Sequence, residues 1–128
     1  MKKYMMALAA IAILTACKKE QKTGTEQVAP AAFEQEMKDN AGQVVDVRMP
    51  KEYAEGHIDG AKNLHIYDAD FAQRLDSLDK DETVYVYCKA GARSAEAVEL
   101  MERKGFKHIV ELEGGLDAWG QAGKPVAK

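Results

Sequence analysis

One cysteine, placed at the start of a short glycine-containing loop, carries the clearest chemistry in this chain. The stretch Cys88-Lys89-Ala90-Gly91-Ala92-Arg93-Ser94 follows the β-forming run 83–87 and precedes a helix-forming run. Backbone N–H groups in such a turn point at the sulfur, and a helix start adds roughly half a positive charge. We therefore expect the Cys88 thiol to ionise more readily than a free cysteine and to act as a nucleophile.

The other residues of this loop are candidates for binding an anionic substrate. Arg93 supplies a full positive charge, and Gly91 permits a tight turn that a side chain would hinder. Lys89 is expected at the rim, where it either attracts anions or is a solvated lysine. The backbone amides of Ala90, Ala92 and Ser94 complete the predicted binding loop. No metal-ligand spacing and no nucleotide-type glycine loop occurs in the sequence, so we expect neither a metal nor a cofactor.

Four segments, in order, together resemble the rhodanese-type sulfurtransferases. They are Val45-Asp46-Val47-Arg48, Gly56-His57-Ile58-Asp59-Gly60-Ala61-Lys62-Asn63, the Cys88 loop with its Cys-x4-Arg spacing, and Leu112-Glu113-Gly114-Gly115-Leu116-Asp117-Ala118-Trp119. The resemblance covers residues 31–122. The cysteine loop alone would be a weak signal, but the ordered set is specific.

The resemblance implies an enzyme that moves sulfane sulfur in two steps. Cys88 would attack a donor such as thiosulfate and become a persulfide, and cyanide or a thiol acceptor, such as a protein thiol, would then remove the sulfur. Two alternatives stay open: a persulfide carrier that a partner protein loads, with little thiosulfate turnover, and an inactive interaction domain. The intact Cys88 argues against the last of these.

Loop length separates these possibilities from a phosphatase. Protein-tyrosine phosphatases use a Cys-x5-Arg loop, whereas four residues lie between Cys88 and Arg93 here. A shorter loop makes a narrower ring of amides, which favours attack on a sulfur atom over attack on a phosphoryl centre.

For Asp46, Arg48 and His57, which lie outside the loop, we considered both a structural and a functional role. Asp46 is expected to support the structure through an ion pair at the end of a strand, with Arg93 as one possible partner. Arg48 is either a donor-binding residue or part of this support. His57 is expected to hold backbone groups of a turn rather than to transfer protons. Trp119 is expected to pack the last helix against the core.

The first 16 residues predict export rather than a folded element. Lys2 and Lys3 precede the apolar run 5–16, which is too short to cross a bilayer and is typical of a secretory signal. The sequence Leu14-Thr15-Ala16-Cys17 resembles a bacterial lipoprotein box, which implies cleavage before Cys17 and lipid on that residue. We expect a lipid-anchored protein of the bacterial cell envelope, facing the periplasm. Its organisation would be a signal over 1–16, a flexible tether over 17–29 and a folded domain over 30–124.

Charge and cysteine content narrow the possible partners. The chain has 18 basic and 21 acidic residues, a net charge of −3, and removal of Lys2 and Lys3 leaves 16 basic residues and −5. An acidic surface argues against a nucleic-acid partner. If Cys17 carries lipid, Cys88 has no cysteine with which to form an internal disulfide, which is typical of a reactive thiol.

Alternating strand and helix patterns predict an α/β domain. Strands are expected over 43–47, 63–66, 83–87 and 108–111, and helices from Pro30 to about Asn40 and over 50–55, 70–78, 94–104 and 116–121. This order predicts a mostly parallel, open, rhodanese-like sheet of four to five short strands with helices on both faces. The Cys88 loop would then lie at the carboxyl end of a strand, where open α/β sheets bind ligands.

Overall fold

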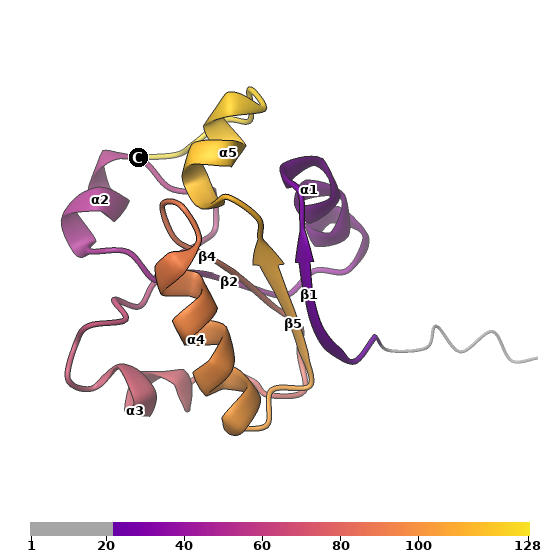
Figure 1. Cartoon of the computed structure of the whole chain (residues 1–128), viewed down its shortest axis with the longest axis vertical. Coiled ribbons are helices and arrows are strands. Elements are labelled where there is room, and N and C mark those ends of the chain that lie inside the picture. The colour runs from indigo at the N-terminus through magenta and orange to yellow at the C-terminus, as the bar shows by residue number, and fades with distance from the viewer. Residues whose placement is uncertain (1–21) are drawn as a thin grey trace, which may run out of the picture.

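The protein folds around one parallel sheet of five strands in the order β1-β5-β4-β2-β3 (Figure 1). This computed structural model describes residues 22–128. The predicted signal segment 1–16, Cys17 and the first part of the predicted tether lie outside the described residues. Within the described part, each helix is too short or too polar to traverse a lipid bilayer.

Strands and helices alternate along the chain, as parallel pairing requires. The strands are β1 (Gly24–Val28), β2 (Gln43–Asp46), β3 (Lys62–Asn63), β4 (Val84–Tyr87) and β5 (His108–Leu112). The helices are α1 (Pro30–Asp39), α2 (Pro50–Glu55), α3 (Phe71–Leu75), α4 (Ala92–Arg103) and α5 (Gly115–Gln121). In Figure 1, α3 and α4 lie on one side of the sheet and α1 on the other.

Strand β4 lies at the centre of the sheet and divides the core into two clusters. Its residues are buried throughout, and successive side chains point to opposite faces. Val84, Val86 and Cys88 join the cluster beneath α3 and α4. Tyr85 and Tyr87 join the cluster that contains residues of α1 and α5. Burial on both faces explains why this strand is a continuous apolar run rather than an alternating one.

The second cluster places Trp119 as the sequence analysis expects. Its ring packs edge-on against Phe33 of α1, with ring centroids 6.2 Å apart. The indole N–H donates to the carbonyl oxygen of Pro125 at 2.9 Å. Trp119 therefore fixes α5 against the sheet, and α5 in turn contacts the cysteine loop.

The predicted fold class is confirmed, and the bounds of several elements differ. Helix α4 begins at Ala92, two residues before the predicted start, because Gly91 already adopts the N-cap position. The predicted strand 63–66 is reduced to Lys62–Asn63, and the predicted helix 70–78 to Phe71–Leu75. These short elements are set by their contacts with neighbours more than by local pattern.

The prediction of a flexible tether over 17–29 is wrong for Gly24–Val28. This segment is the edge strand β1, which pairs in parallel with β5 from Gly24 opposite His108 to Val28 opposite Leu112. The segment is mostly polar because one side of an edge strand faces solvent, so it lacks the apolar period that marks an inner strand. Only tertiary pairing makes it a strand.

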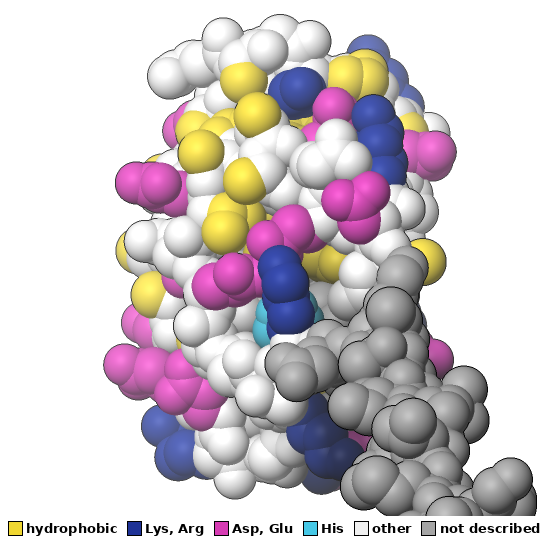
Figure 2. Space-filling view, turned by 90° about the vertical axis from the view of Figure 1, so that its right-hand side faces the viewer, with side chains coloured by type: hydrophobic (Ala, Val, Ile, Leu, Met, Phe, Trp, Pro, Cys, Tyr) yellow, Lys and Arg dark blue, Asp and Glu magenta, His cyan; other side chains and the backbone are white. Residues whose placement is uncertain are grey.

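Polar contacts fasten β1 to the rest of the domain. On the face shown in Figure 2, acidic side chains gather around a basic side chain and a histidine. Glu26 Oε1 lies 3.3 Å from Nε2 of buried His108, and Lys22 Nζ lies 3.6 Å from Glu36 Oε1. Burial, together with the adjacent Glu26, raises the pKa of Glu36. The other ring nitrogen of His108 contacts the hydroxyl of Thr83 at 2.8 Å.

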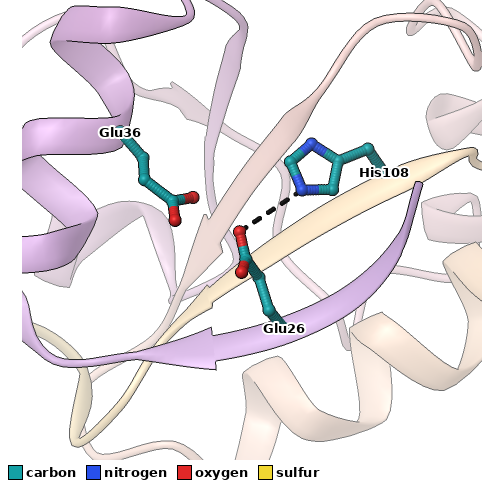
Figure 3. A group of neighbouring side chains, drawn as sticks. All are labelled: Glu26, Glu36 and His108. Atoms are coloured by element: carbon teal, nitrogen blue, oxygen red, sulfur yellow. Dashed lines mark hydrogen bonds and ion pairs between the residues drawn. The ribbon is translucent and has the colours of Figure 1, made fainter. Parts of the chain in front are cut away.

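Glu26, Glu36 and His108 are close enough to act as metal ligands, and Figure 3 shows that they come from β1, α1 and β5. Each of the two carboxylates nevertheless has a nitrogen partner within the described residues. We therefore assign this cluster to the attachment of the edge strand. The absence of a metal stays a prediction of the sequence.

Candidate active site

Cys88 lies directly after β4, where the chain turns from the central strand into α4. Its Sγ accepts a hydrogen bond from the Gly91 backbone N–H at 3.0 Å. The Ser94 hydroxyl oxygen lies 3.4 Å from the same sulfur. The sequence analysis predicts this position at the carboxyl end of a strand and before a helix, and the structure places Cys88 there. The Gly91 N–H donates to the sulfur, and the thiol in turn donates to the Ser94 hydroxyl oxygen.

The sulfur is enclosed by the surrounding residues. Cys88 is only 1% exposed, because it continues the inward face of β4 beneath α4. Several inward amides were expected, and among the described residues the Gly91 N–H is the one that reaches Sγ. The polar contacts with Gly91 and Ser94 nevertheless distinguish this thiol from an inert cysteine in an apolar core. A donor must therefore reach a sulfur that lies beneath the loop.

Gly91 makes the turn possible. Its φ of 119° lies in the left-handed region, where residues with a side chain are strained. The position also serves as the N-cap of α4, and its carbonyl accepts the Ala95 N–H at 3.1 Å. The neighbouring Lys89, Ala90 and Ala92 are exposed, so the loop surface that faces solvent is formed mainly by these residues.

The glycine pair before α5 holds the cysteine loop from the other side. Leu116 N–H donates to the Cys88 carbonyl at 2.8 Å, and Asp117 N–H donates to the Lys89 carbonyl at 3.0 Å. A Cβ on Gly115 would lie 2.5 Å from each of these carbonyl oxygens. Only glycine allows the helix start to approach so closely. Because the two carbonyls are engaged by α5, they are held away from the sulfur.

Arg93 is engaged in a two-pronged ion pair. Its guanidinium donates to Glu52 Oε1 at 2.6 Å and to Oε2 at 3.1 Å, and both side chains are about four-fifths buried. The hydrogen bond with Glu52 raises the pKa of Arg93, and the same contact lowers that of Glu52. Glu52 also accepts the Met49 N–H at 3.3 Å, which caps α2. The sequence analysis missed Glu52, whose only local signal is its capping position in a short helix.

Lys89 is also paired. Its ammonium lies 2.9 Å from Oδ2 and 3.1 Å from Oδ1 of Asp117, in the first turn of α5. Both side chains are about half exposed, so this contact is screened by water and contributes little to stability. The pair still links the loop surface to α5. Whether Lys89 attracts anions stays a prediction.

Asp46 and Arg48 form a buried pair at the end of β2. The Asp46 carboxylate accepts from Arg48 Nε at 3.1 Å and from its NH2 group at 2.8 Å. The Arg48 NH2 group also donates to the Gly56 carbonyl at 2.6 Å. The partner of Asp46 is thus Arg48 and not Arg93, which is held by Glu52 instead. Arg48 is 5% exposed. This geometry favours its structural role, and donor binding by Arg48 stays a prediction.

His57 occupies a turn, as the sequence analysis expects. Its Nδ1 lies 2.9 Å from the Tyr53 carbonyl oxygen, and its ring stacks on that of Tyr53 at 3.8 Å between centroids. The backbone of His57 pairs with Ala127 in both directions, at 2.9 and 2.8 Å. These contacts join α2 to the C-terminal segment and support the structure around the site.

Glu111 is a second residue near the sulfur that the sequence analysis missed. It follows Val110 on β5, is 6% exposed, and its Oε2 lies 2.7 Å from Ser94 Oγ. Burial raises the pKa of its carboxyl, and the hydrogen bond with Ser94 offsets part of that shift. In the sequence it occupies an inward position of a β run, where an acid is unexpected. That mismatch is the signal that could have identified it.

Comparison with known proteins agrees with this geometry. A family model described as "Rhodanese-like domain" matches residues 29–122, which is most of the chain. The chain belongs to the rhodanese-like family. The match includes the Cys88 loop, the His57 segment and the Gly114-Gly115 pair.

Curated relatives of this rhodanese-like chain include a named sulfurtransferase. The thiosulfate sulfurtransferase GlpE of Pseudomonas aeruginosa is 33% identical over 94 residues, which cover 73% of this chain and 83% of GlpE. The Bacillus subtilis protein YqhL is 38% identical over 86 residues. That match covers 67% of this chain, but only 65% of the length of YqhL, just under two thirds.

Solved structures show the same fold. The crystal structure of a rhodanese-related protein from Thermoplasma volcanium has a TM-score of 0.71 and is 33% identical to this chain. The similarity covers 80% of this chain and 97% of that protein. The rhodanese-like fold is thus shared over nearly the whole of that protein.

Proposed function

We propose that this protein is a sulfurtransferase that carries sulfane sulfur on Cys88. The observation that carries the proposal is the sulfur at the end of β4, with the Gly91 N–H at 3.0 Å and the Ser94 hydroxyl at 3.4 Å. The Gly91 N–H is a donor that favours a thiolate nucleophile and would also stabilise the terminal sulfur anion of a persulfide, and the Ser94 oxygen accepts from the thiol. The family and the similarity to a thiosulfate sulfurtransferase support the same chemistry.

Each step of the proposed reaction balances without a cofactor. The Cys88 thiolate attacks the outer sulfur of thiosulfate, a sulfur–sulfur bond forms, and the bond to the sulfite group breaks. Sulfite leaves with its electron pair, and Cys88 becomes a persulfide anion. Cyanide or a thiolate then attacks the outer sulfur and regenerates the Cys88 thiolate. Neither step needs a separate general base if the thiol is already ionised.

A persulfide carrier that a partner protein loads is the second candidate. It is favoured by the pairing of Arg93 with Glu52, because this contact reduces the positive charge available to a free dianion. The burial of Cys88 points the same way, since a small donor in solution must enter beneath the loop. Such a carrier would accept sulfur from a protein or a polysulfide and would turn over thiosulfate poorly.

Mass spectrometry of the intact protein tests the chemistry. We expect wild-type protein to gain the mass of one sulfur atom with thiosulfate, to release sulfite, and to lose that sulfur to cyanide. Cys88→Ser should gain nothing while retaining its fold, since serine replaces one atom at the site. Loading from polysulfide but not from thiosulfate would select the carrier. A gain of sulfur by Cys88→Ser would place the chemistry at another residue.

We propose further that the protein is a lipoprotein of the bacterial cell envelope. The support is in the sequence alone: Lys2 and Lys3, the apolar run 5–16, and the lipoprotein-type segment that ends in Cys17. Lipid on Cys17 would hold the domain at a membrane surface, and stable anchoring takes two or more acyl chains. The sulfur donor and acceptor would then be small anions or protein thiols of that compartment.

A further inference from the structure

Within residues 22–128, a buried acid that has no basic partner lies next to the proposed nucleophile. Glu111 is 6% exposed, and its two recorded side-chain contacts are with neutral groups: Ser94 Oγ at 2.7 Å and Gln27 Nε2 at 3.4 Å. Burying a carboxylate without a cation is costly, so such a group tends to keep its proton. The persulfide chemistry proposed above makes no use of this residue.

Ser94 joins this acid to the sulfur. It is fully buried, and its hydroxyl oxygen lies 2.7 Å from Glu111 Oε2 and 3.4 Å from Cys88 Sγ. A hydroxyl has one proton and can donate to only one of these groups at a time. When it donates to a Glu111 carboxylate, its oxygen can accept the Cys88 S–H. When Glu111 is protonated, the acid can donate to Ser94, and Ser94 can donate to the thiolate.

The charged groups around this chain of contacts are few. Arg93 acts on Cys88 from α4, but its charge is shared with Glu52 of α2. Lys89 and Asp117 form a pair at the exposed rim. β1 contributes the neutral amide of Gln27, and the Gly91 carbonyl, 3.1 Å from Ser94 Oγ, is a competing acceptor. Among the described residues, therefore, no contact recorded for the Glu111 carboxyl comes from a base.

We propose that Glu111 shares one proton with Cys88 through the Ser94 hydroxyl and so sets how fully the thiol is ionised. In the transfer, the Cys88 S–H proton passes to Ser94 Oγ, and the Ser94 hydroxyl proton passes to Glu111 Oε2. The products are a thiolate and a neutral carboxylic acid, and the total charge is unchanged. Glu111 is a positioning residue in this scheme, since it acts on the sulfur only through Ser94.

The shared proton has a consequence for sulfur transfer, which rests on the proposed function. Both reaction steps convert one sulfur anion into another, so the proton can stay on Glu111 throughout. A protonated Glu111 directs the Ser94 hydroxyl at the sulfur. An ionised Glu111 turns that hydroxyl away and leaves the thiol protonated. The pair therefore titrates together, and its two ionisation steps belong to both groups.

The pH dependence of alkylation of Cys88 by iodoacetamide tests the proposal in the absence of any sulfur donor. We expect two rising steps in wild-type protein, separated by a plateau in which one proton is shared. Glu111→Gln should show a single step, because the amide cannot ionise. The midpoint of that step should lie about one pH unit below the midpoint of the upper wild-type step. Between these two midpoints, Glu111→Gln should be alkylated about tenfold faster than wild type. A wild-type profile with one step that coincides with that of Glu111→Gln would overturn the proposal.

Two further variants separate the roles of charge and hydrogen bonding. Glu113→Gln removes an exposed acid two residues away on the same segment, and it should keep the wild-type profile. Ser94→Ala keeps the carboxyl but removes the bridge, so the two steps should move closer together. An unchanged separation in Ser94→Ala would show that the hydroxyl does not carry the proton. Titration of thiols in the denatured protein confirms that each variant is reduced. Circular dichroism in the range where Trp119 absorbs confirms that each variant is folded.

Sulfite release by the same proteins keeps this inference distinct from the proposed function. If wild-type protein releases no sulfite from thiosulfate and gains no sulfur from polysulfide, the proposed function fails, and the alkylation profiles still decide the role of Glu111. If transfer occurs and the profiles of wild type and Glu111→Gln coincide, the shared proton is wrong and the transferase remains.

Discussion

At the scale of single residues, the balance of charge around the sulfur depends on acids as much as on bases. Arg93 is one of two basic residues of the cysteine loop, yet Glu52 holds it with two short contacts. A donor anion must compete with that carboxylate or share the guanidinium with it. If the site binds a small anion, as proposed, we expect its affinity to depend on Glu52 of α2 as well as on the cysteine loop.

Substitution of Glu52 measures this competition. Glu52→Gln keeps a side chain that can cap α2 and removes the charge on Arg93's partner. We expect the KM for thiosulfate to fall roughly fivefold, the effect of about 1 kcal/mol in a charged hydrogen bond. This decrease in KM should be smaller at high ionic strength, because salt screens the charge of Arg93. Steady-state sulfite release provides the measurement, and an unchanged KM would mean that the donor does not use Arg93.

Arg93→Ala is the opposite change. If Arg93 stabilises charge on the donor, its loss should lower kcat/KM by about 2 to 4 kcal/mol of transition-state stabilisation, the range for one oxyanion donor. Alkylation of Cys88 by a neutral reagent reports whether the thiol itself is intact. Unaltered turnover in Arg93→Ala would mean that the backbone N–H of Gly91 and the Ser94 hydroxyl suffice.

At the scale of elements, the start of α5 acts as a clamp on the cysteine loop. The N–H groups of Leu116 and Asp117 hold the carbonyls of Cys88 and Lys89. With those carbonyls fixed, the following residues turn so that the Gly91 N–H meets the sulfur. Gly115 is the residue that permits this approach, with a φ of 60° and no room for a side chain.

Alanine at Gly115 should therefore damage both stability and activity. The left-handed backbone and the contact with two carbonyl oxygens together should cost about 2 to 4 kcal/mol of unfolding free energy. Gly120→Ala, in the same helix, is the matched control. A Cβ there meets nothing within 4 Å, so that variant should be as stable as wild type or slightly more stable. Urea denaturation compares the two, and equal stabilities would contradict the proposed clamp.

At the scale of the whole molecule, the domain is closed by an edge strand that begins near the start of the described region. Gly24 is the first residue of β1 and pairs with His108, the first residue of β5. The chain therefore enters the sheet at the amino end of β5. The cysteine loop lies at the opposite, carboxyl end of the parallel strands.

Fractionation of cells tests the anchor. We expect wild-type protein in the membrane fraction and Cys17→Ser in the soluble fraction, because the acyl chains supply the binding free energy. Sulfur loading of purified Cys17→Ser should match that of wild type, which shows that the domain is intact. Membrane retention of Cys17→Ser would place the anchor in another part of the chain.

Much of this protein follows from the sequence because the decisive signals are local. The spacing of Cys88, Gly91 and Arg93 predicted the loop, and short apolar, β-forming runs predicted four of the five strands. The edge strand β1 escaped the pattern because its polar residues gain strand structure only by pairing with β5. A periodic pattern of apolar residues marks a buried face, and β1, at the edge of the sheet, has no fully buried side chain.

Tertiary structure decided which charges meet. Asp46 binds Arg48, Glu52 reaches Arg93 across 41 positions, and Glu111 reaches Ser94 across 17. The last two pairs join elements far apart in the chain, so no spacing in the sequence reveals them. The sequence by itself predicted that Cys88 follows a strand and precedes a helix, and the structure confirms that position. Its enclosure, its neighbours and the charge they leave at the sulfur were set by how strands and helices pack, since electrostatic interactions depend on distance in space and on burial.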